Sequence, residues 1–251
     1  MRVLILGGTT EASSLARLLA NDARFEATLS LAGRTAQPAP QALLTHIGGF
    51  GGIEGLVRHL RDEKIVAVVD ATHPYADQMS AHAVAACGRA AIPLASLVRA
   101  PWTRQAGDHW IEAVDTRAAT DAIGRDPRRV FLTIGRQELP VFAAAPQHHY
   151  LARIIDAPGD DTLPPNLSLV QARGPFDLAT ETALLRDQRI EVVVSKNAGG
   201  EATYAKIAAA RALGVPVIMI ARPHKPAGHV TETPEDAVAW LDHVRRSLRG
   251  V

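Results

Sequence analysis

The sequence predicts an α/β fold built from two similar domains with parallel sheets. Three observations predict it: apolar and helix-like segments alternate, the order of segments occurs twice, and the length suits two small domains. The 251 residues are 47% hydrophobic, which is enough to fill a substantial core. Aromatic residues make up only 4%, so we expect a core made mainly of Ala, Val, Leu and Ile.

Short apolar runs alternate with helix-like segments from the first residues onward. "RVLIL" at 2–6 precedes the helix-like 11–21, and the apolar run "FEATLSLA" follows at 25–32. The pattern continues with apolar runs at 65–71 and 92–97 and a helix-like run at 76–91 between them. Continuous apolar runs are typical of strands covered on both faces, and this alternation is typical of parallel βαβ units.

The second half of the chain repeats the order of the first. Three apolar runs recur with slowly drifting offsets: Arg2 and Arg129 (129 − 2 = 127), Ile65 and Ile190 (190 − 65 = 125), Ile92 and Val215 (215 − 92 = 123). Each half then ends in a helix-like stretch, at 116–124 and at 233–248. The alternative is that all α/β strands look alike, but three matches in order favour a repeat.

The repeat predicts two Rossmann-like or flavodoxin-like domains that meet near "RDPRR" at 125–129. We expect residues 1–125 to form the N-terminal domain and residues 126–251 the C-terminal domain, although a final strand or helix could pack on the other half. Open α/β sheets bind ligands beyond the carboxyl ends of their strands. Two such domains facing one another would form a cleft between those ends.

Composition excludes several classes of protein. A net charge of +1 argues against a general nucleic-acid binder. The single cysteine, Cys87, excludes an internal disulfide and a cysteine-based zinc cage. No apolar run reaches the ~18 residues that a membrane span needs, and no signal peptide opens the chain. We therefore expect a cytoplasmic protein without nucleic-acid or membrane partners, either a monomer or a small homo-oligomer.

A glycine turn follows the first predicted strand, in "LILGGTTEA". Gly7 and Gly8 would let the backbone approach an anion, and Thr9 and Thr10 could add hydroxyl donors at the helix N-terminus. Glu11 would repel a phosphate unless it points away. The turn matches neither G-x-G-x-x-G nor the P-loop pattern, so a tight strand–helix turn with threonine caps is the alternative.

Two further segments of the first half suit a nucleotide. Arg34 follows the second strand, where an arginine suits the 2′-phosphate of NADP; the alternative is a solvated surface arginine. The glycine-rich loop around Gly49, Phe50 and Gly51 allows close backbone approach, and Phe50 could stack on a flat ring. A merely flexible loop is the alternative there.

The segment "DATHPYA" at 70–76 concentrates polar side chains at a strand tip. Local capping explains Asp70 or Thr72, but it does not explain His73 and Tyr75. A metal site is a poor explanation, because no second His or Cys lies at ligand spacing. Basic residues also recur at predicted strand ends, although some will be ordinary surface charges: Arg34, Arg99, Arg104, Arg136, Lys196, Arg222 and Lys225. Together they predict a polyanionic ligand.

With these motifs the sequence resembles the precorrin-6A reductases of cobalamin biosynthesis. The matching elements are "ILGGTTEA" at 5–12, "DATHPYA" at 70–76, "VSKNAGG" at 194–200 and "ARALGVPVIMIARP" at 210–223. The resemblance implies NADPH-dependent reduction of one double bond in a tetrapyrrole macrocycle, in an active site between two nucleotide-binding-like domains. The substrate's acetate and propionate groups would suit a basic rim.

The resemblance and the residues together give an expected site. NADPH is expected on the N-terminal domain at Gly7, Gly8, Thr9, Thr10, Arg34, Gly49, Phe50, Gly51 and Thr72. The tetrapyrrole is expected at His73, Tyr75, Arg99, Arg136, Lys196, Asn197, Arg222 and Lys225. Hydride would come from NADPH, and the proton from solvent, Tyr75 or Lys196. No metal is expected.

Two other functions stay open. One is reduction of the cobalt-containing analogue of the same macrocycle, which the sequence does not separate from the metal-free substrate. The other is a non-catalytic two-domain protein that senses a nucleotide or an anion with the same basic residues.

Overall fold

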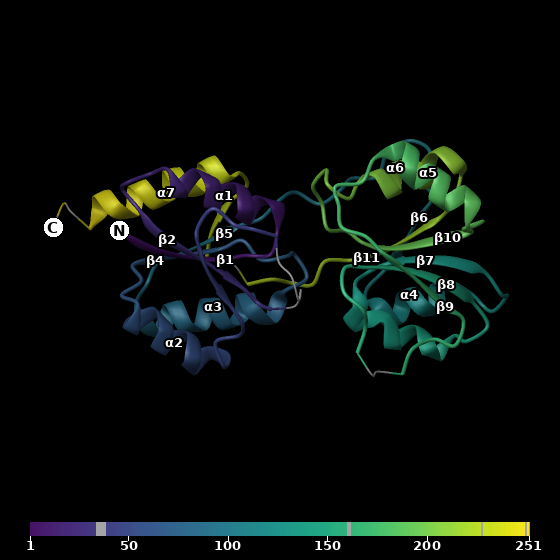
Figure 1. Cartoon of the computed structure of the whole chain (residues 1–251), viewed down its shortest axis with the longest axis horizontal. Coiled ribbons are helices and arrows are strands. Elements are labelled where there is room, and N and C mark those ends of the chain that lie inside the picture. Colours follow the sequence, from purple (N-terminus) through teal and green to yellow (C-terminus); the bar gives the residue numbers. More distant parts are fainter. Residues whose placement is uncertain (34–38, 160–161, 227, 249, 251) are drawn as a thin grey trace. The chain divides into compact units, whose positions relative to one another are not determined.

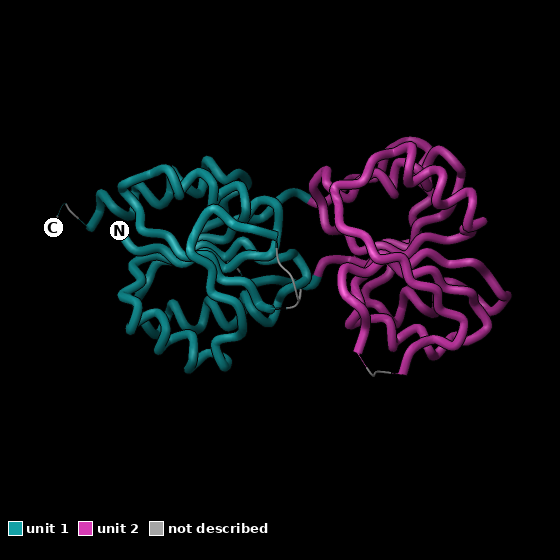
Figure 2. Tube along the Cα trace, in the orientation of Figure 1, with its two compact units in different colours: residues 1–100, 223–251 teal, residues 101–222 magenta. Residues whose placement is uncertain are grey.

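The computed structural model describes residues 1–33, 39–159, 162–226, 228–248 and 250. The chain forms two compact units, coloured separately in Figure 2. Unit 1 comprises residues 1–100 and 223–251, and unit 2 comprises residues 101–222. Each unit contains a six-stranded sheet, and the paired strands run parallel, as predicted.

Unit 1 has the strand order β12-β5-β4-β1-β2-β3. Its strands are β1 (Arg2–Leu6), β2 (Glu26–Leu31), β3 (Leu44–Ile47), β4 (Ala67–Asp70), β5 (Leu94–Leu97) and β12 (His229–Thr231). Helices cover both faces of the sheet (Figure 1): α1 (Thr10–Ala20) and α7 (Pro234–Ser247) on one face, α2 (Gly52–Asp62) and α3 (Asp77–Ala90) on the other.

The central strand β1 shows why the apolar runs are continuous. Val3 and Ile5 belong to the core beneath α1 and α7, whereas Leu4 belongs to the core beneath α2 and α3. Successive side chains of a strand point to opposite faces, so a strand with helices on both sides needs apolar residues at every position. All three of these side chains are fully buried.

Unit 2 has the strand order β6-β11-β10-β7-β8-β9. Its strands are β6 (Trp110–Ala113), β7 (Arg129–Thr133), β8 (His149–Ile154), β9 (Leu167–Gln171), β10 (Val192–Lys196) and β11 (Val217–Ile220). One face carries α5 (Leu178–Asp187) and α6 (Ala205–Leu213), and the other carries α4 (Thr116–Ala122) and the 3₁₀ helix η1 (Arg136–Ala144) (Figure 1).

The two sheets correct the expected division into residues 1–125 and 126–251. The segment β6–α4 belongs to unit 2, and the segment β12–α7 belongs to unit 1. The two strand orders become identical when β12 and β6 are treated as equivalents, which agrees with the internal repeat. The halves have therefore exchanged their last strand and helix. A strand can pair with any open sheet edge. Here β6 pairs with β11 in unit 2, and β12 pairs with β5 in unit 1.

The sequence did not reveal the strands that lie at the sheet edges. β3, β6, β9 and β12 are the four edge strands, with the sequences LTHI, WIEA, LSLVQ and HVT. An edge strand has one neighbour and more solvent contact, so its residues need not form a continuous apolar run. Among the described residues, no helix is long and apolar enough to cross a membrane.

Candidate functional site

The connection between β1 and α1 in unit 1 forms an open turn at a helix N-terminus. The amide of Gly7 donates to the Ser30 carbonyl oxygen at 2.8 Å. A Cβ at Gly7 would lie 2.6 Å from Leu29 Cδ1, so a larger residue there would require the buried Leu29 side chain to shift. Gly8 has a φ of +121°, and a Cβ on it would meet nothing within 4 Å. Unpaired amides of the first helical turn face such an opening.

Thr9 is the N-cap of α1, and its hydroxyl group is committed within the protein. The Oγ1 atom accepts from the Ala12 amide at 3.1 Å and donates to the Ala71 carbonyl oxygen at 2.8 Å. Thr10, which is exposed, donates from Oγ1 to Glu11 at 3.1 Å. The threonine-cap alternative is therefore correct for Thr9. An anion at this turn would be met by backbone N–H groups and not by the Thr9 hydroxyl.

Glu11 does not leave an uncompensated negative charge at this turn. Its carboxylate pairs with Arg99 at 2.9 Å, and the two side chains are only 20% and 15% exposed. Arg99, which was expected to bind substrate, therefore has a partner on the same unit. The pair brings Arg99, the second residue after β5, next to the first turn of α1, and it reduces the repulsion expected between Glu11 and a phosphate.

Asp70, the last residue of β4, is the buried centre of a second polar cluster. Its side chain is 1% exposed and accepts from the amide and hydroxyl of Thr72, at 3.1 and 2.7 Å. The Ser80 hydroxyl also donates to it. Lys225 lies 3.5 Å from the carboxylate and donates to Thr72 Oγ1 at 2.9 Å. Asp70 does not cap α3, because the N-cap of that helix is Ala76 and has no side-chain hydrogen bond. It holds the residues after β4 in place, and Lys225 compensates its buried charge.

The residues around these two clusters pack closely. A crevice of only about 10 Å³ lies among Thr9, Glu11, Thr72, Pro74, Leu97, Val98, Arg99 and Lys225. A crevice of that size has room for about one water molecule. Residues that the sequence predicted for the site, including Thr9, Thr72 and Lys225, are therefore neighbours in unit 1 and line this small crevice.

His73 and Tyr75 follow the β4 tip and precede α3. Their ring centroids lie 5.7 Å apart at 40°, and the Tyr75 amide donates to His73 Nδ1 at 3.3 Å. Pro74 between them is buried, whereas both rings are half-buried. The buried proline and the Asp70 cluster fix the backbone, so two partly exposed rings are held at the carboxyl end of the strand.

The glycine-rich loop between β3 and α2 packs its aromatic ring inward. Phe50 stacks on His46, with centroids 5.2 Å apart, and lies 4.9 Å from the His59 ring. Burial and the neighbouring His46 lower the pKa of His59. Gly51 is the N-cap of α2, with a φ of +78°. Arg34, the expected 2′-phosphate residue, lies outside the described residues.

Lys196 ends β10 in unit 2 and pairs with a carboxylate that the sequence reasoning missed. Its ammonium group contacts Glu138 Oε1, and Glu138 Oε2 accepts from Thr116 Oγ1 at 2.6 Å. The repeat offset could have found Glu138, because Glu11 lies at the equivalent position of the first half (11 + 127 = 138). The repeat offset does not identify Thr116 as a partner of Glu138, because Thr116 belongs to the exchanged segment β6–α4.

Asn197 and Arg222 support the loop after β10. The Asn197 side chain accepts from the Trp102 amide at 2.8 Å and donates to the Trp102 carbonyl oxygen at 3.0 Å. Arg222 donates to the carbonyl oxygens of Asn197 and Ala198, at 2.8 and 3.0 Å. Arg136 donates to the Ala157 carbonyl oxygen at 2.9 Å. Three residues expected to bind substrate thus have backbone partners within unit 2.

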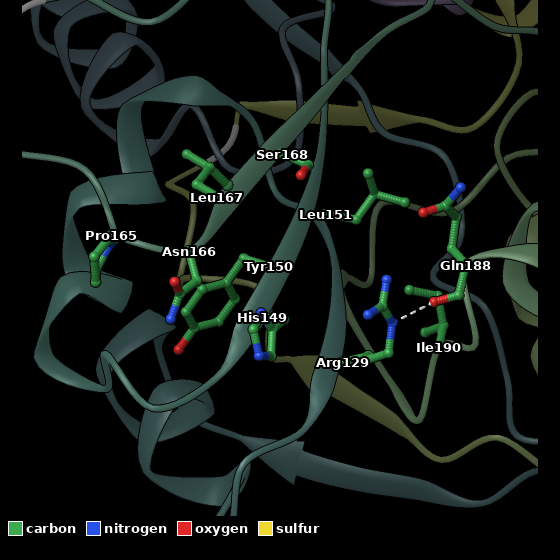
Figure 3. A pocket seen from close by; sticks show the side chains of 10 residues that line it. All are labelled: Arg129, His149, Tyr150, Leu151, Pro165, Asn166, Leu167, Ser168, Gln188 and Ile190. Carbon is green, nitrogen blue, oxygen red and sulfur yellow. Dashed lines mark hydrogen bonds between the residues drawn. The ribbon is translucent and has the colours of Figure 1, made fainter.

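A larger pocket of unit 2 lies at the opposite ends of the strands. Its volume is about 320 Å³, and Arg129 and His149, the first residues of β7 and β8, line it (Figure 3). Arg129 is held there by a 2.6 Å hydrogen bond to the Gln188 carbonyl oxygen. Parallel α/β sheets bind ligands at the carboxyl ends, so the candidate site is the other edge. The described residues contain no group of three or more His, Cys, Asp or Glu placed to hold a metal ion.

The parallel sheets and the glycine turn at a helix N-terminus define a Rossmann-like, two-unit α/β protein. The chain belongs to the family described as precorrin-6x reductase CbiJ/CobK, whose model matches residues 2–242. It is 52% identical to a precorrin-6A reductase of Rhodobacter capsulatus over 100% of this chain and 99% of that protein. A solved structure of the CobK precorrin-6A reductase matches with a TM-score of 0.93 and 53% identity, covering 97% of each chain. A cobalt-precorrin-6A reductase of Salmonella typhimurium is 30% identical over 88% of this chain and 87% of that protein.

Proposed function

We propose that this protein reduces one double bond of precorrin-6A with NADPH. Membership of the reductase family supports the reaction class. The observation in the molecule that carries the proposal is the β1–α1 turn, where the space beside Gly8 is open and the amides of the first turn of α1 lie at its edge. The likeness to the relative named precorrin-6A reductase exceeds that to the relative named for the cobalt form, which favours precorrin-6A.

The residues of unit 1 suit a dinucleotide phosphate. The pyrophosphate would lie against Gly7, Gly8, Thr9 and Thr10, bound mainly by backbone N–H groups at the N-terminus of α1. The Glu11–Arg99 pair makes the turn compatible with negative charge. Arg34 is proposed to bind the 2′-phosphate, which would distinguish NADPH from NADH. Gly49, Phe50, Gly51 and Thr72 are proposed to form the rest of the cofactor wall.

The reaction adds one hydride and one proton to the double bond. NADPH, when bound, supplies the hydride. In unit 1, His73 and Tyr75 are proposed to contact the macrocycle, because their rings are partly exposed at the β4 tip. In unit 2, Lys196 is proposed to bind a substrate carboxylate or to donate the proton, and solvent is the alternative donor. Proximity supplies much of the rate in such a reaction.

The remaining basic residues have a different proposed role. Arg136, Arg222 and Lys225 each donate to a backbone carbonyl oxygen, and Asn197 uses both amide atoms on Trp102. We propose that they chiefly maintain the loops that bear the site. The positive charges of Arg136, Arg222 and Lys225 still contribute to the local potential that attracts a polycarboxylate.

The test is a titration of the protein with NADPH and precorrin-6A while the absorbance of the cofactor is followed. We expect one NADPH to be oxidised for each macrocycle reduced, and NADPH to bind more tightly than NADH. Arg34→Ala should remove most of that preference, whereas Arg17→Ala, on the exposed side of α1, should retain it.

Three outcomes would contradict parts of the proposal. Binding of both ligands without oxidation of NADPH would indicate the sensor function. Equal affinity for NADPH and NADH, unchanged by Arg34→Ala, would refute the cofactor assignment. Faster turnover of the cobalt-loaded macrocycle than of precorrin-6A in a competition assay would refute the substrate assignment.

A further inference from the structure

We propose that Glu138 is a positioning residue that holds the Lys196 ammonium group in place at the carboxyl end of β10. The inference rests on the proposed function, because it gives Lys196 a part in the reaction. It adds a residue, Glu138, and a supporting residue, Thr116, that act through Lys196 and not on the substrate itself.

The contacts of Glu138 are divided between its two oxygen atoms. Oε1 takes the Lys196 ammonium group, and Oε2 accepts from the Thr116 hydroxyl at 2.6 Å. Glu138 lies in the first turn of η1, directly after β7, and Lys196 is the last residue of the neighbouring strand β10. A carboxylate with a fixed partner on each oxygen cannot rotate freely, so it defines one location for the ammonium group.

Partial burial distinguishes the Glu138–Lys196 contact from an ordinary surface ion pair. The Lys196 side chain is 15% exposed and that of Glu138 is 29% exposed. Exposed pairs contribute little to stability because water and salt screen them, whereas partly buried ones are screened less. A lysine side chain has many accessible rotamers, so Lys196 without its partner Glu138 would sample many positions. A proton donor or a carboxylate-binding group works only within hydrogen-bond reach of its target.

The repeat shows that the lysine is particular to unit 2. Glu11, the equivalent of Glu138, also pairs with a cation, but that cation is Arg99 after β5. The position equivalent to Lys196 in unit 1 is Ala71 (196 − 125 = 71), which has no polar side chain and whose carbonyl oxygen accepts from the Thr9 hydroxyl. Both units therefore keep a paired carboxylate after the equivalent strands β1 and β7, whereas only unit 2 has a lysine directly after the equivalent positions Asp70 and Ser195.

Thr116 links this arrangement to the exchange of segments. It is the first residue of α4, which belongs to unit 2 although it precedes β7 in the chain. Without the exchanged segment, Glu138 Oε2 would lose its hydrogen-bond donor. The exchange therefore supplies a group that fixes the carboxylate and, through it, the lysine.

The first experiment measures the pairing without relying on activity. The full-length protein is treated briefly with acetic anhydride, and acetylation of Lys196 is followed by peptide mass spectrometry, with the exposed Lys64 of unit 1 as reference. An ion-paired, partly buried amine reacts slowly. We expect Glu138→Gln to raise the rate at Lys196 at least fivefold relative to Lys64, and Thr116→Val to raise it about twofold. An unchanged rate in Glu138→Gln would overturn the proposal.

The second experiment is a double-mutant cycle on reduction of precorrin-6A. We expect Glu138→Gln to lower kcat about tenfold, to leave KM for the macrocycle and the dissociation constant for NADPH within twofold, and to be partly rescued by Glu138→Asp. In a Lys196→Met background, Glu138→Gln should lower kcat no further.

The outcomes of the cycle distinguish failure of the Glu138 inference from failure of the proposed reductase function. Equal losses from Glu138→Gln with and without Lys196 would show that Glu138 acts independently, and full activity in Lys196→Met would remove the lysine it is said to position; either result overturns the inference. A wild-type protein that oxidises no NADPH with the macrocycle would refute the proposed function instead, and the acetylation rates would then still decide whether Glu138 holds Lys196.

Discussion

The turn after β1 in unit 1 and the turn after β7 in unit 2 occupy the same place in the repeat, yet they differ in chemistry. In unit 1, Gly8 leads into an α-helix that Thr9 caps with its side chain. In unit 2, Gly135 leads into a 3₁₀ helix that contains Pro140 and has no side-chain cap. The first turn leaves the space beside Gly8 open, whereas the second places Glu138 against Lys196. The repeat thus preserves the strand frame, while the loops at its carboxyl edge determine the chemistry.

The tips of the equivalent strands β4 and β10 differ in the same way. Asp70 buries a carboxylate that Thr72, Ser80 and Lys225 compensate. The equivalent position in unit 2 is Ser195 (195 − 70 = 125), whose neutral hydroxyl donates to the Lys196 carbonyl oxygen. Unit 1 therefore depends on a buried charge pair at this point and unit 2 does not.

The largest effect on stability should come from removing the buried charge pair of unit 1, in comparison with the equivalent neutral residue of unit 2. Asp70→Asn leaves the Lys225 ammonium group without its counter-charge, which typically costs about 3–5 kcal/mol for a buried pair. Ser195→Ala removes one neutral hydrogen bond and should cost about 1 kcal/mol. Urea unfolding of both variants measures the contrast. Equal losses would show that the two strand tips are energetically alike.

The next effect concerns the two glycines that begin the turns. Gly8→Ala forces a residue with a side chain to a φ of +121° and puts a methyl group into the open space, so we expect NADPH affinity to fall roughly 100-fold. Gly135→Ala imposes comparable strain at a φ of +93° in unit 2 and should leave NADPH affinity within twofold. Fluorescence titration with NADPH separates them. A similar loss in both would argue against assigning the cofactor to unit 1 alone.

A smaller effect appears at alkaline pH. Burial and the neighbouring Asp70 raise the pKa of Cys87 to about 12, and burial also raises the pKa of Tyr150 in unit 2. Each neutral group is favoured by folding, so its contribution is complete below its unfolded pKa and is lost as pH rises through the folded pKa. Cys87 alone should cost about 1 kcal/mol between pH 9 and 10.

Comparing wild type with Cys87→Ala over pH 8–11 isolates the cysteine. The variant should have a shallower decline in unfolding free energy over that range, with Tyr150 contributing only at higher pH. Parallel curves for the two proteins would contradict the raised pKa of Cys87.

The smallest effect concerns the cap of α1. Thr9→Val removes the hydrogen bonds to Ala12 and Ala71 and should lower unfolding free energy by about 1 kcal/mol. Thr10→Val alters an exposed hydroxyl that donates to the adjacent Glu11 and should change the unfolding free energy by no more than about 0.5 kcal/mol. Thermal unfolding measures both. In unit 2, the N-cap Gly135 of η1 has no side-chain hydrogen bond. Substitution of Arg136, the equivalent of Thr9 (136 − 9 = 127), should therefore destabilise the protein less than Thr9→Val does.

Much of the candidate site was predictable because its residues follow strands that are recognisable from their apolar runs. Gly7, Gly8, His73 and Lys196 all lie directly after such runs, and parallel strands place those ends on one edge of each sheet. The partners of the charged residues were not predictable in the same way. Arg99 and Glu11 are 88 residues apart, and Lys225 is 153 residues from Thr72. No local pattern encodes which remote side chain will compensate a buried charge.

The sequence by itself determined the class of fold, the internal repeat, the glycine turn and the family. Each of these follows from residue types and spacings over short stretches of the chain. Only the tertiary structure decided that β6–α4 and β12–α7 exchange places, since a short edge strand such as HVT can pair with any open sheet edge and carries no mark of its partner. That exchange brings Thr116 to Glu138, whose other carboxylate oxygen contacts Lys196 at the end of β10.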